Sequence, residues 1–419
     1  MRRTFRTLND CEMQHNAEVG LFTRPSDGMK NMSRKRKTDE LYQGFEQGPI
    51  RPPSEAHSLL IRVTRNCPWN RCTFCPVYKG SRFSVRSVDH VKKDIDAIHT
   101  SIQMIRDMAD ENGRIRRSEI RKASGNHEPP DPGAFNAALN WFAGGMNSIF
   151  IQDANSLIIK PKDFIKILIH LKNRFPRVER ITSYARSHTI ARIKDSDLEK
   201  IKDAGLNRIH IGLESGSDTV LKMAKKGVTQ ATHVKAGLKV KKAGMELSEY
   251  IMSGLGGREY SKIHALETAD ALNRINPDFI RLRTLAIPNT VELFHDWEAG
   301  RFEKCTDLMM AKEILLLIEA LNGITSVVKS DHILNLFETV EGTLPRDKES
   351  MLEIIRTFLA MEPERQCVYQ VGRRLGFFSR ISDMERPHRL KKAEKACRQF
   401  GVTWENVDEV IDELMKRFI

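Results

Sequence analysis

The chain has 419 residues, of which 40% are hydrophobic and 29% charged, and its formal net charge is +13. This length is well above that at which a hydrophobic core becomes marginal, and the composition excludes a wholly disordered chain. The positive charge is compatible with a nucleic-acid partner, but basic residues spaced along helices more often lie on a solvated face. Charge alone therefore does not favour such a partner.

The N-terminal residues 1–56 are predicted to form a flexible basic arm. They mix polar residues with Gly, Pro and the basic run SRKRK (Ser33–Lys37), and such a segment buries little apolar area. The chain begins without the apolar run of a secretory signal. The longest uncharged stretch, Pro132–Gln152, contains asparagines and a Gly-Gly pair, which predict a helix, a turn and a strand. We therefore expect a cytoplasmic protein without a membrane segment.

From Ser58 onward, short apolar runs alternate with helical patterns, which predicts a parallel sheet with helices outside it. Glycines at 205 and 244 stand where helix C-terminal caps are expected. We assign residues 57–304 to an α/β barrel, open or closed, and residues 305–419 to a helical C-terminal cap. The six predicted strands are SLLIRVT, NSIFIQ, RITSY, RIHIGL, LSEYIM and FIRLRTL.

Three cysteines follow the first predicted strand within the stretch NCPWNRCTFC, at positions 67, 72 and 75. Closely spaced thiolates in a reducing compartment select zinc or an iron-sulfur cluster. Structural zinc normally takes four protein ligands, so His57 or His90 would have to complete that site. A [4Fe-4S] cluster usually takes four cysteines, and three would leave one iron free to bind another molecule.

The stretch NCPWNRCTFC, placed after the first strand of a βα series, resembles the signature loop of the radical S-adenosylmethionine (radical SAM) superfamily. The usual spacing there is C-x3-C-x2-C, and this chain has one more residue between Cys67 and Cys72. The segments IHIGLESGSDTVLKMAKKGVT and YIMSGLGG are similar to the fourth strand and the fifth-strand turn of the branch containing oxygen-independent coproporphyrinogen oxidases and methylthiotransferases. The resemblance covers roughly residues 58–293.

The resemblance implies a partial (β/α)6 TIM-like barrel, with a C-terminal helical extension, that holds a [4Fe-4S] cluster and S-adenosyl-L-methionine. Cys67, Cys72 and Cys75 would be the cluster ligands, and an electron donor such as flavodoxin or ferredoxin would be a partner. For each implied cofactor contact, helix capping or charge pairing is an equally good explanation. By position in the family pattern, the expected contacts are Phe74 near adenine, Asp153 and Asn155 at the methionine amine, Arg186 at its carboxylate, and Glu214 and Ser215 at the ribose or methionine.

The segment SDHILN, which begins at Ser330, resembles a C-terminal extension found in a group of radical SAM proteins. Asp331, His332 and Asn335 are candidates for lining a substrate cavity or donating a proton; helix capping at Ser330 or Asp331 is the alternative. Cys305, Cys367 and Cys397 lack ligand-like spacing and are expected to be core thiols rather than ligands of a second cluster.

Two hypotheses about function follow from these patterns. The first is a radical SAM enzyme that cleaves S-adenosylmethionine reductively and abstracts hydrogen from a substrate that the sequence does not identify. The alternative is a non-catalytic, zinc-stabilised module that binds RNA through its basic faces.

Overall fold

A computed structural model describes residues 41–110 and 131–416 of the chain. The basic run at 33–37 and Cys11 lie outside these residues. Residues 43–419 form one compact unit, so neither predicted domain boundary, at 57 or at 305, coincides with a boundary of that unit. The division into arm, barrel and cap stays a prediction.

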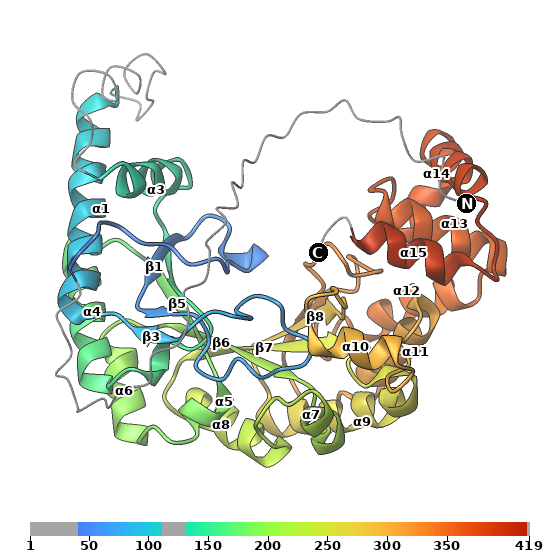
Figure 1. Ribbon diagram of the computed structural model, residues 1–419, viewed down its shortest axis with the longest axis horizontal. Coiled ribbons are helices and arrows are strands. Elements are labelled where there is room, and N and C mark those ends of the chain that lie inside the picture. The colour runs from blue at the N-terminus through green and yellow to red at the C-terminus, as the bar shows by residue number, and fades with distance from the viewer. Residues whose placement is uncertain (1–40, 111–130, 417–419) are drawn as a thin grey trace, which may run out of the picture. The chain divides into compact units, whose positions relative to one another are not determined.

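A single large sheet organises this unit (Figure 1). All of its neighbouring strands are parallel except the last pair, β9 and β10. A separate small ribbon joins β2 (Thr64–Arg65) to β3 (Ser84–Val85). In spatial order, the large sheet contains β1 (Leu59–Arg62), β4 (Ser148–Gln152), β5 (Arg180–Ala185), β6 (Arg208–Glu214), β7 (Glu246–Ser253), β8 (Phe279–Thr284), β9 (Val327–Lys329) and β10 (Gly342–Thr343).

Helices connect the strands and follow one another along one side of the sheet, from α1 through α4, α6, α8 and α9 to α11 (Figure 1). In the barrel region the helices are α1 (Val88–Met108), α3 (Pro132–Ala143), α4 (Pro161–Arg174), α5 (Ser187–Ile190), α6 (Asp195–Asp203), α7 (Asp218–Met223), α8 (Gln230–Lys242), α9 (Gly257–Ile275) and α10 (Glu292–Glu298). Beyond it lie α11 (Asp307–Ala320), α12 (Lys348–Leu359), α13 (Pro363–Arg374), α14 (Pro387–Phe400) and α15 (Val407–Met415). Short 3-10 helices are η1 (Pro53–Glu55), η2 (Ser156–Ile158) and η3 (Ile381–Glu385).

The two faces of the sheet differ in chemistry because successive side chains point to opposite sides of a strand. One set packs against the helices in the main hydrophobic core and includes Ile149, Ile181, Ile209 and Leu247. The other set is aromatic and polar. Its rings contact one another from strand to strand, with centroids 5.2 Å apart for Phe150 and Tyr184, 5.5 Å for Tyr184 and His210, and 5.4 Å for His210 and Tyr250.

All six predicted strands and the helical patterns between them are confirmed. The stretch 132–152 is α3, a turn and β4, as expected from its asparagines and glycines. The mostly parallel α/β fold is therefore the one that the alternating pattern predicts. Because β1 and β4 to β8 are parallel, their carboxyl ends share one edge, and loops at that edge are where cofactor sites form in such sheets.

Residues 43–56 belong to the compact unit, and Glu55 is fully buried there beside Ser58 and His210. The assignment of residues 1–56 to a flexible arm stays a prediction. Helix α13 and strands β9 and β10 were not predicted. The strands have only three and two residues, too short for a pattern, and α13 carries many charged and polar residues.

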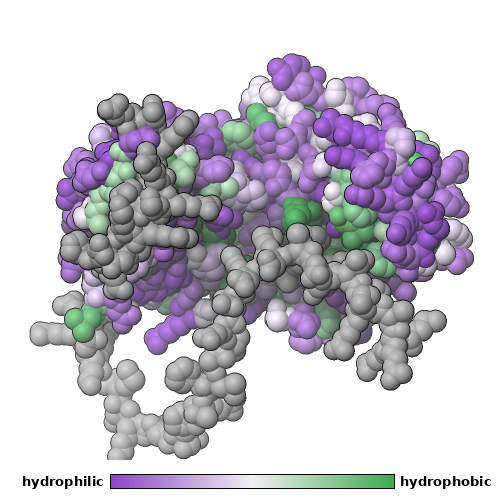
Figure 2. Space-filling model, turned by 90° about the horizontal axis from the view of Figure 1, so that it is seen from above, coloured by the Kyte–Doolittle hydropathy of each residue, from purple (hydrophilic) through white to green (hydrophobic). Residues whose placement is uncertain are grey.

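The visible surface of the described residues is mainly hydrophilic with small, separate hydrophobic patches (Figure 2). No helix within the described ranges is long and apolar enough to cross a membrane.

Candidate functional site

The cysteine loop, residues 66–75, begins directly after β2 at the carboxyl edge of the sheet. Two asparagines let it turn sharply, because Asn tolerates the left-handed conformation: φ is 68° at Asn66 and 46° at Asn70. The Asn70 side chain donates to the Tyr78 carbonyl at 2.5 Å, and the Thr73 amide donates to the Ala224 carbonyl at 3.1 Å. The loop is thus fixed both to the segment that follows it and to the turn after α7.

The three cysteines of the loop are free thiols and half-buried. Burial raises the pKa of Cys72 and of Cys75, and the neighbouring cysteines raise both pKa values further. The amide of Asn70 donates to the Cys67 sulfur at 3.4 Å. The thiols therefore lie near one another at a site where holding them as thiolates requires positive charge.

Two cations supply that charge. Lys226 and Arg186 both act to lower the pKa of Cys72. Burial lowers the pKa of Lys226, but the Glu214 carboxylate and Cys72 more than offset burial, so its pKa is raised and it is charged. The Lys226 ammonium lies 2.9 Å from a Glu214 oxygen. Burying an ammonium is costly unless it is paired, so this pair accounts for its position beside the sulfur.

Glu214 points into the site because β6 ends in an irregularity. The register of β6 against β7 shifts between Gly212 and Glu214, and Glu214 adopts φ of 64°. A β-bulge re-aims a side chain in this way, often beside active sites. Gly212 leaves room for the carboxylate, since a Cβ there would lie 2.2 Å from a Glu214 oxygen.

Trp69 links the cysteine loop to the two cations. Its indole donates to the Lys225 carbonyl at 2.7 Å, and the Arg186 guanidinium lies 4.9 Å from its ring centroid. A Cβ at Gly227, which has φ of 71°, would meet the Trp69 ring at 2.3 Å. Only glycine therefore allows the ring to pack against the turn that carries Lys226.

Asp153 is fully buried at the end of β4, and its oxygens are engaged within the protein. They accept from the Arg62 Nε at 2.8 Å, the Asn66 amide at 3.0 Å and the Tyr78 hydroxyl at 2.9 Å. These bonds join the sheet to the start of the cysteine loop. In this structure Asp153 orients the loop, and its contact with the methionine amine stays a prediction.

Asn155 and Ser215 are also buried and hydrogen-bonded to neighbouring turns. Asn155 donates to Thr189 at 2.8 Å and accepts from the Arg186 amide at 3.0 Å. The Ser215 hydroxyl lies 2.8 Å from His264 and accepts from the Ser217 amide at 3.0 Å. Both fix the turns that present Arg186 and Glu214.

Phe74 packs in a hydrophobic cluster beside the cysteines. The cluster includes Leu255 of the turn after β7 and Leu285 after β8, and Cys72 and Cys75 pack against it. Phe74 and the glycine turn after β7, which the sequence places together near adenine by resemblance, thus lie in one hydrophobic cluster.

The alternative metal ligands do not gather here. His57 lies beside Gly144 after α3, and His90 is in the first turn of α1. Across residues 41–110 and 131–416, no group of three or more His, Cys, Asp or Glu side chains is arranged to hold a single metal ion. Within the described residues, therefore, neither the three cysteines nor any set that includes His57 or His90 forms a ready-made site for a single zinc ion.

The remaining described cysteines are buried. Cys367 and Cys397 are in the second hydrophobic cluster, and burial raises the pKa of Cys305 to about 12. Buried positions of this kind are those expected for thiols that belong to the hydrophobic core.

The Ser330 segment contains no helix, so capping does not explain Ser330 or Asp331. Asp331 pairs with Arg281 and Arg283 of β8. Asn335 is buried and donates to Ser330 and to the Leu282 carbonyl, both at 3.0 Å. Burial lowers the pKa of His332 to about 4, so this imidazole is neutral near pH 7. Asp331 and His332 therefore face the inner side of β8.

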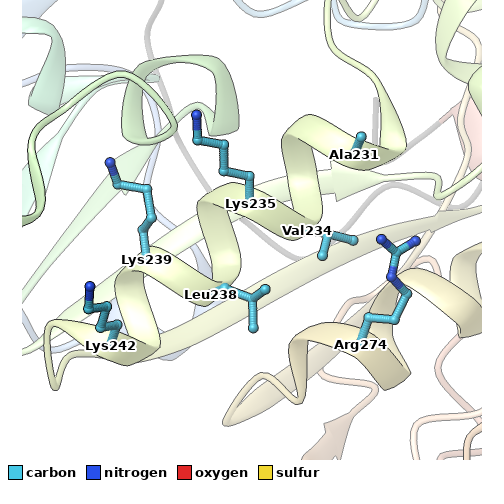
Figure 3. Close-up of a pocket in the computed structure, with 7 residues that line it drawn as sticks. All are labelled: Ala231, Val234, Lys235, Leu238, Lys239, Lys242 and Arg274. Atoms are coloured by element: carbon cyan, nitrogen blue, oxygen red, sulfur yellow. The ribbon is translucent and has the colours of Figure 1, made fainter.

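A separate groove of about 400 Å³ lies between α8 and α9 and contains none of the predicted site residues (Figure 3). It is lined by Lys235, Leu238, Lys239 and Lys242 of α8 and by Arg274 of α9. Asp195 pairs with two of these lysines, and Asp270 pairs with Arg274. The groove therefore lacks the thiols of the cysteine site, and most of its cations are paired with surface carboxylates.

The structure brings Arg186 and Glu214 to the cysteines, and it adds Lys226 and Trp69, which sequence reasoning did not single out. Trp69 stands inside the quoted cysteine stretch, and Lys226 inside the quoted segment after β6. A glycine directly after the Lys-Lys pair was the available signal for a tight turn there.

Residues 61–269 match the family model described as the radical SAM superfamily. No curated protein sequence matches the chain significantly. An archaeal Elp3 from Methanocaldococcus infernus is similar in structure, with a TM-score of 0.38, 14% identity and coverage of 58% of this chain and 57% of that one. Coproporphyrinogen III oxidase from Escherichia coli is also similar in structure, with a TM-score of 0.41, 12% identity and coverage of 62% of this chain and 52% of that one.

Methylornithine synthase is also similar, with a TM-score of 0.39, 12% identity and coverage of 71% of this chain and 68% of that one. The chain thus spans little more than half the length of the first two structures. TM-scores below 0.5 indicate distant likeness only. None of these matches supports a zinc-stabilised RNA-binding module.

Proposed function

Because this chain belongs to the radical SAM superfamily, we propose that Cys67, Cys72 and Cys75 hold its [4Fe-4S] cluster and that it abstracts hydrogen from a substrate. The superfamily is one of enzymes that use this cluster with S-adenosylmethionine. When bound, the cluster supplies the electron for cleaving the cofactor and so generates the radical that attacks substrate. The observation that supports the proposal is the placement of three free thiols on one fixed loop beside two partly buried cations.

The donor set is suited to such a cluster. Thiolates are its usual ligands, and three leave a coordination position for the cofactor. Lys226 and Arg186 offset the negative charge of the thiolates, because attraction between opposite charges is strong where water is excluded. Asp153 holds the loop in place through Arg62 and Asn66.

S-adenosylmethionine would be held at the carboxyl edge of the sheet. We propose that Arg186 and Lys226 attract its carboxylate and that Glu214 attracts its amine, since these charged groups already face the cysteines. Phe74 and the turn at Leu255 would pack near adenine. Asp153, Asn155 and Ser215 would act by positioning these groups, in place of the direct contacts first expected.

Flavodoxin or ferredoxin is proposed as electron donor by family resemblance alone. The cytoplasm stays the proposed compartment because the sequence begins without the apolar run of a secretory signal.

The test is metal and product analysis of anaerobically reconstituted protein. We expect roughly four irons and four sulfides per chain, by cluster stoichiometry, and 5'-deoxyadenosine when dithionite and S-adenosylmethionine are added. Replacing Cys67, Cys72 and Cys75 by Ala should remove the iron. Cys397→Ala is the matched control because this buried thiol lies in a different cluster. A single tightly held zinc, or no 5'-deoxyadenosine from fully loaded protein, would contradict the proposal.

A further inference from the structure

A second group of buried charges lies on the inner face of β8, apart from the cysteine loop. Arg281 and Arg283 alternate there with Ile280 and Leu282, which belong to the hydrophobic core. The arginine side chains are only 5% and 9% exposed. Guanidinium groups buried this far need partners, because an unpaired buried charge is costly.

The partners present do not satisfy both arginines. Asp331 accepts from Arg281 and, at 2.9 Å, from the Arg283 Nη1. Arg281 also donates to Ser248 at 3.1 Å. The Nη2 of Arg283 is buried and has no hydrogen-bond partner. Two guanidiniums thus share one carboxylate, and one donor is left over.

The surroundings leave the surplus positive charge in place. Arg283 lies 4.7 Å from the ring centroid of Tyr250, a contact that fixes the guanidinium without neutralising it. His332 has a pKa of about 4 and contributes no charge near pH 7. Asp331 is the most exposed residue of this charge group, because a quarter of its side chain is accessible to solvent. An incoming group would therefore approach past Asp331.

The group is connected to the cysteine site through the inner face of the sheet. The Tyr250 ring lies 6.0 Å from that of Tyr184, and Arg283 and Glu214 have opposite effects on the pKa of Tyr184. One tyrosine therefore lies within the electrostatic reach of both charge groups. A molecule held at β8 would face the cofactor site across Tyr184.

We propose that Arg281 and Arg283 bind an anionic group, a carboxylate or a phosphate, of the substrate. The identification of this ligand as substrate rests on the proposed function; the anion site itself does not. Arginine presents a planar fork that matches the paired oxygens of either group. Asp331 accepts from both arginines in the absence of the anion, and the anion would take the free Nη2 donor and compete with Asp331.

The test uses methylphosphonate and acetate as probes, with saturation-transfer NMR on the full chain at low ionic strength. We expect saturable binding of at least one probe, and the tighter one identifies the anion class. Arg283→Met should weaken that binding at least tenfold, as loss of a charge-assisted contact does. Asp331→Asn should tighten it several-fold by removing the competing carboxylate. Arg301→Met, at an exposed arginine paired with Asp296, is the matched control and should change nothing.

Tightening in Asp331→Asn cannot result from misfolding, so it keeps the test informative if Arg283→Met folds poorly. Absence of saturable binding in both the wild type and Asp331→Asn, or equal binding in Arg283→Met and the wild type, would overturn the anion site. Failure of S-adenosylmethionine cleavage without substrate would instead count against the proposed function, because probe binding does not need the cluster.

Discussion

The cysteine-side cluster (Lys226, Arg186 and Glu214) and the β8 cluster (Arg281, Arg283 and Asp331) contain the same number of charges of each sign. Each contains two cations and one carboxylate, and in each an arginine lies over an aromatic ring, Trp69 at 4.9 Å or Tyr250 at 4.7 Å. They differ in what the surplus charge faces. At the first it faces three thiols, and at the second it faces a buried donor without a partner.

The difference shows that two neighbouring cations do not by themselves indicate a function. The group that they face has to be known as well. At the cysteine loop the surplus charge is matched by ligands that the chain itself provides. At β8 one buried donor among the described residues has no such partner, and this is the position at which we propose that an external anion binds. Four predictions test this comparison, and they are given in order from the largest expected effect to the smallest.

Asp153→Ala should have the largest effect and should affect one cluster alone. The change leaves Arg62 and the Asn66 amide without a buried acceptor, so we expect a loss of about 3 kcal/mol in the free energy of unfolding. Iron content should fall with it, whereas probe binding at β8 should persist. Denaturant titration and iron analysis measure these effects. Iron retention in a destabilised variant would show that Asp153 does not position the cysteines.

Lys226→Met should lower formation of 5'-deoxyadenosine by roughly 100-fold while iron is retained, since a charge-assisted contact and the partner of Glu214 are lost. Arg281→Met, the matched change at β8, should leave cofactor cleavage without substrate within about threefold of wild type. Single-turnover assays on loaded protein measure both. Equal losses in the two variants would mean that the clusters act as one site.

His210 lies on the same face of the sheet as the β8 cluster, with its ring near Tyr184 and Tyr250 and its Nε2 3.4 Å from the buried Glu55. Burial lowers its pKa to about 4, so the unfolded chain binds a proton near pH 6.5 that the folded chain does not. Stability should therefore fall as pH decreases from 7 to 5.5, and His210 should account for about 1.2 kcal/mol of that loss.

His210→Gln should remove this part of the loss and flatten the profile. Urea titrations of cluster-free protein at the two pH values measure it. A variant with the same pH dependence as wild type would place the titrating group elsewhere, for instance at His233, whose pKa is about 3.

Trp69→Leu should have the smallest effect, about 1 kcal/mol in the free energy of unfolding, from the lost ring contact with Arg186 and the indole hydrogen bond. Tyr250→Leu removes the corresponding ring at β8 and should cost a similar amount. Chemical denaturation compares the two. A change near zero for Trp69 alone would show that the loop is held by its other hydrogen bonds.

The sequence predicted the β8 strand but not its charge cluster. The alternation of Arg with Ile and Leu in FIRLRT was the available signal, because residues two apart share a face. Their convergence with Asp331 depends on a loop about fifty positions later, and no local pattern contains it. The cysteine loop, in contrast, was predictable because its ligands are adjacent in sequence.

Lys226 and the roles of Asp153 and Asn155 were not predictable for a related reason. Lys226 is one of 68 lysines and arginines, and what distinguishes it is burial beside a bulge in β6. Whether the Asp153 oxygens bind a ligand or the chain depends on Arg62 and Tyr78, which approach it only in the folded state.

The segment at Gly48 has a consequence for how the chain folds as it is made. The amide and carbonyl of Gly48 both bond to the side chain of Gln152, 104 residues further along. At roughly 5 to 20 residues per second, synthesis reaches Gln152 about 5 to 20 s after Gly48. Glu46, which pairs with Arg62 and Arg65, faces a shorter delay. The earliest described part of the chain therefore has to wait for β4 before it can dock, although β1 follows it directly in sequence.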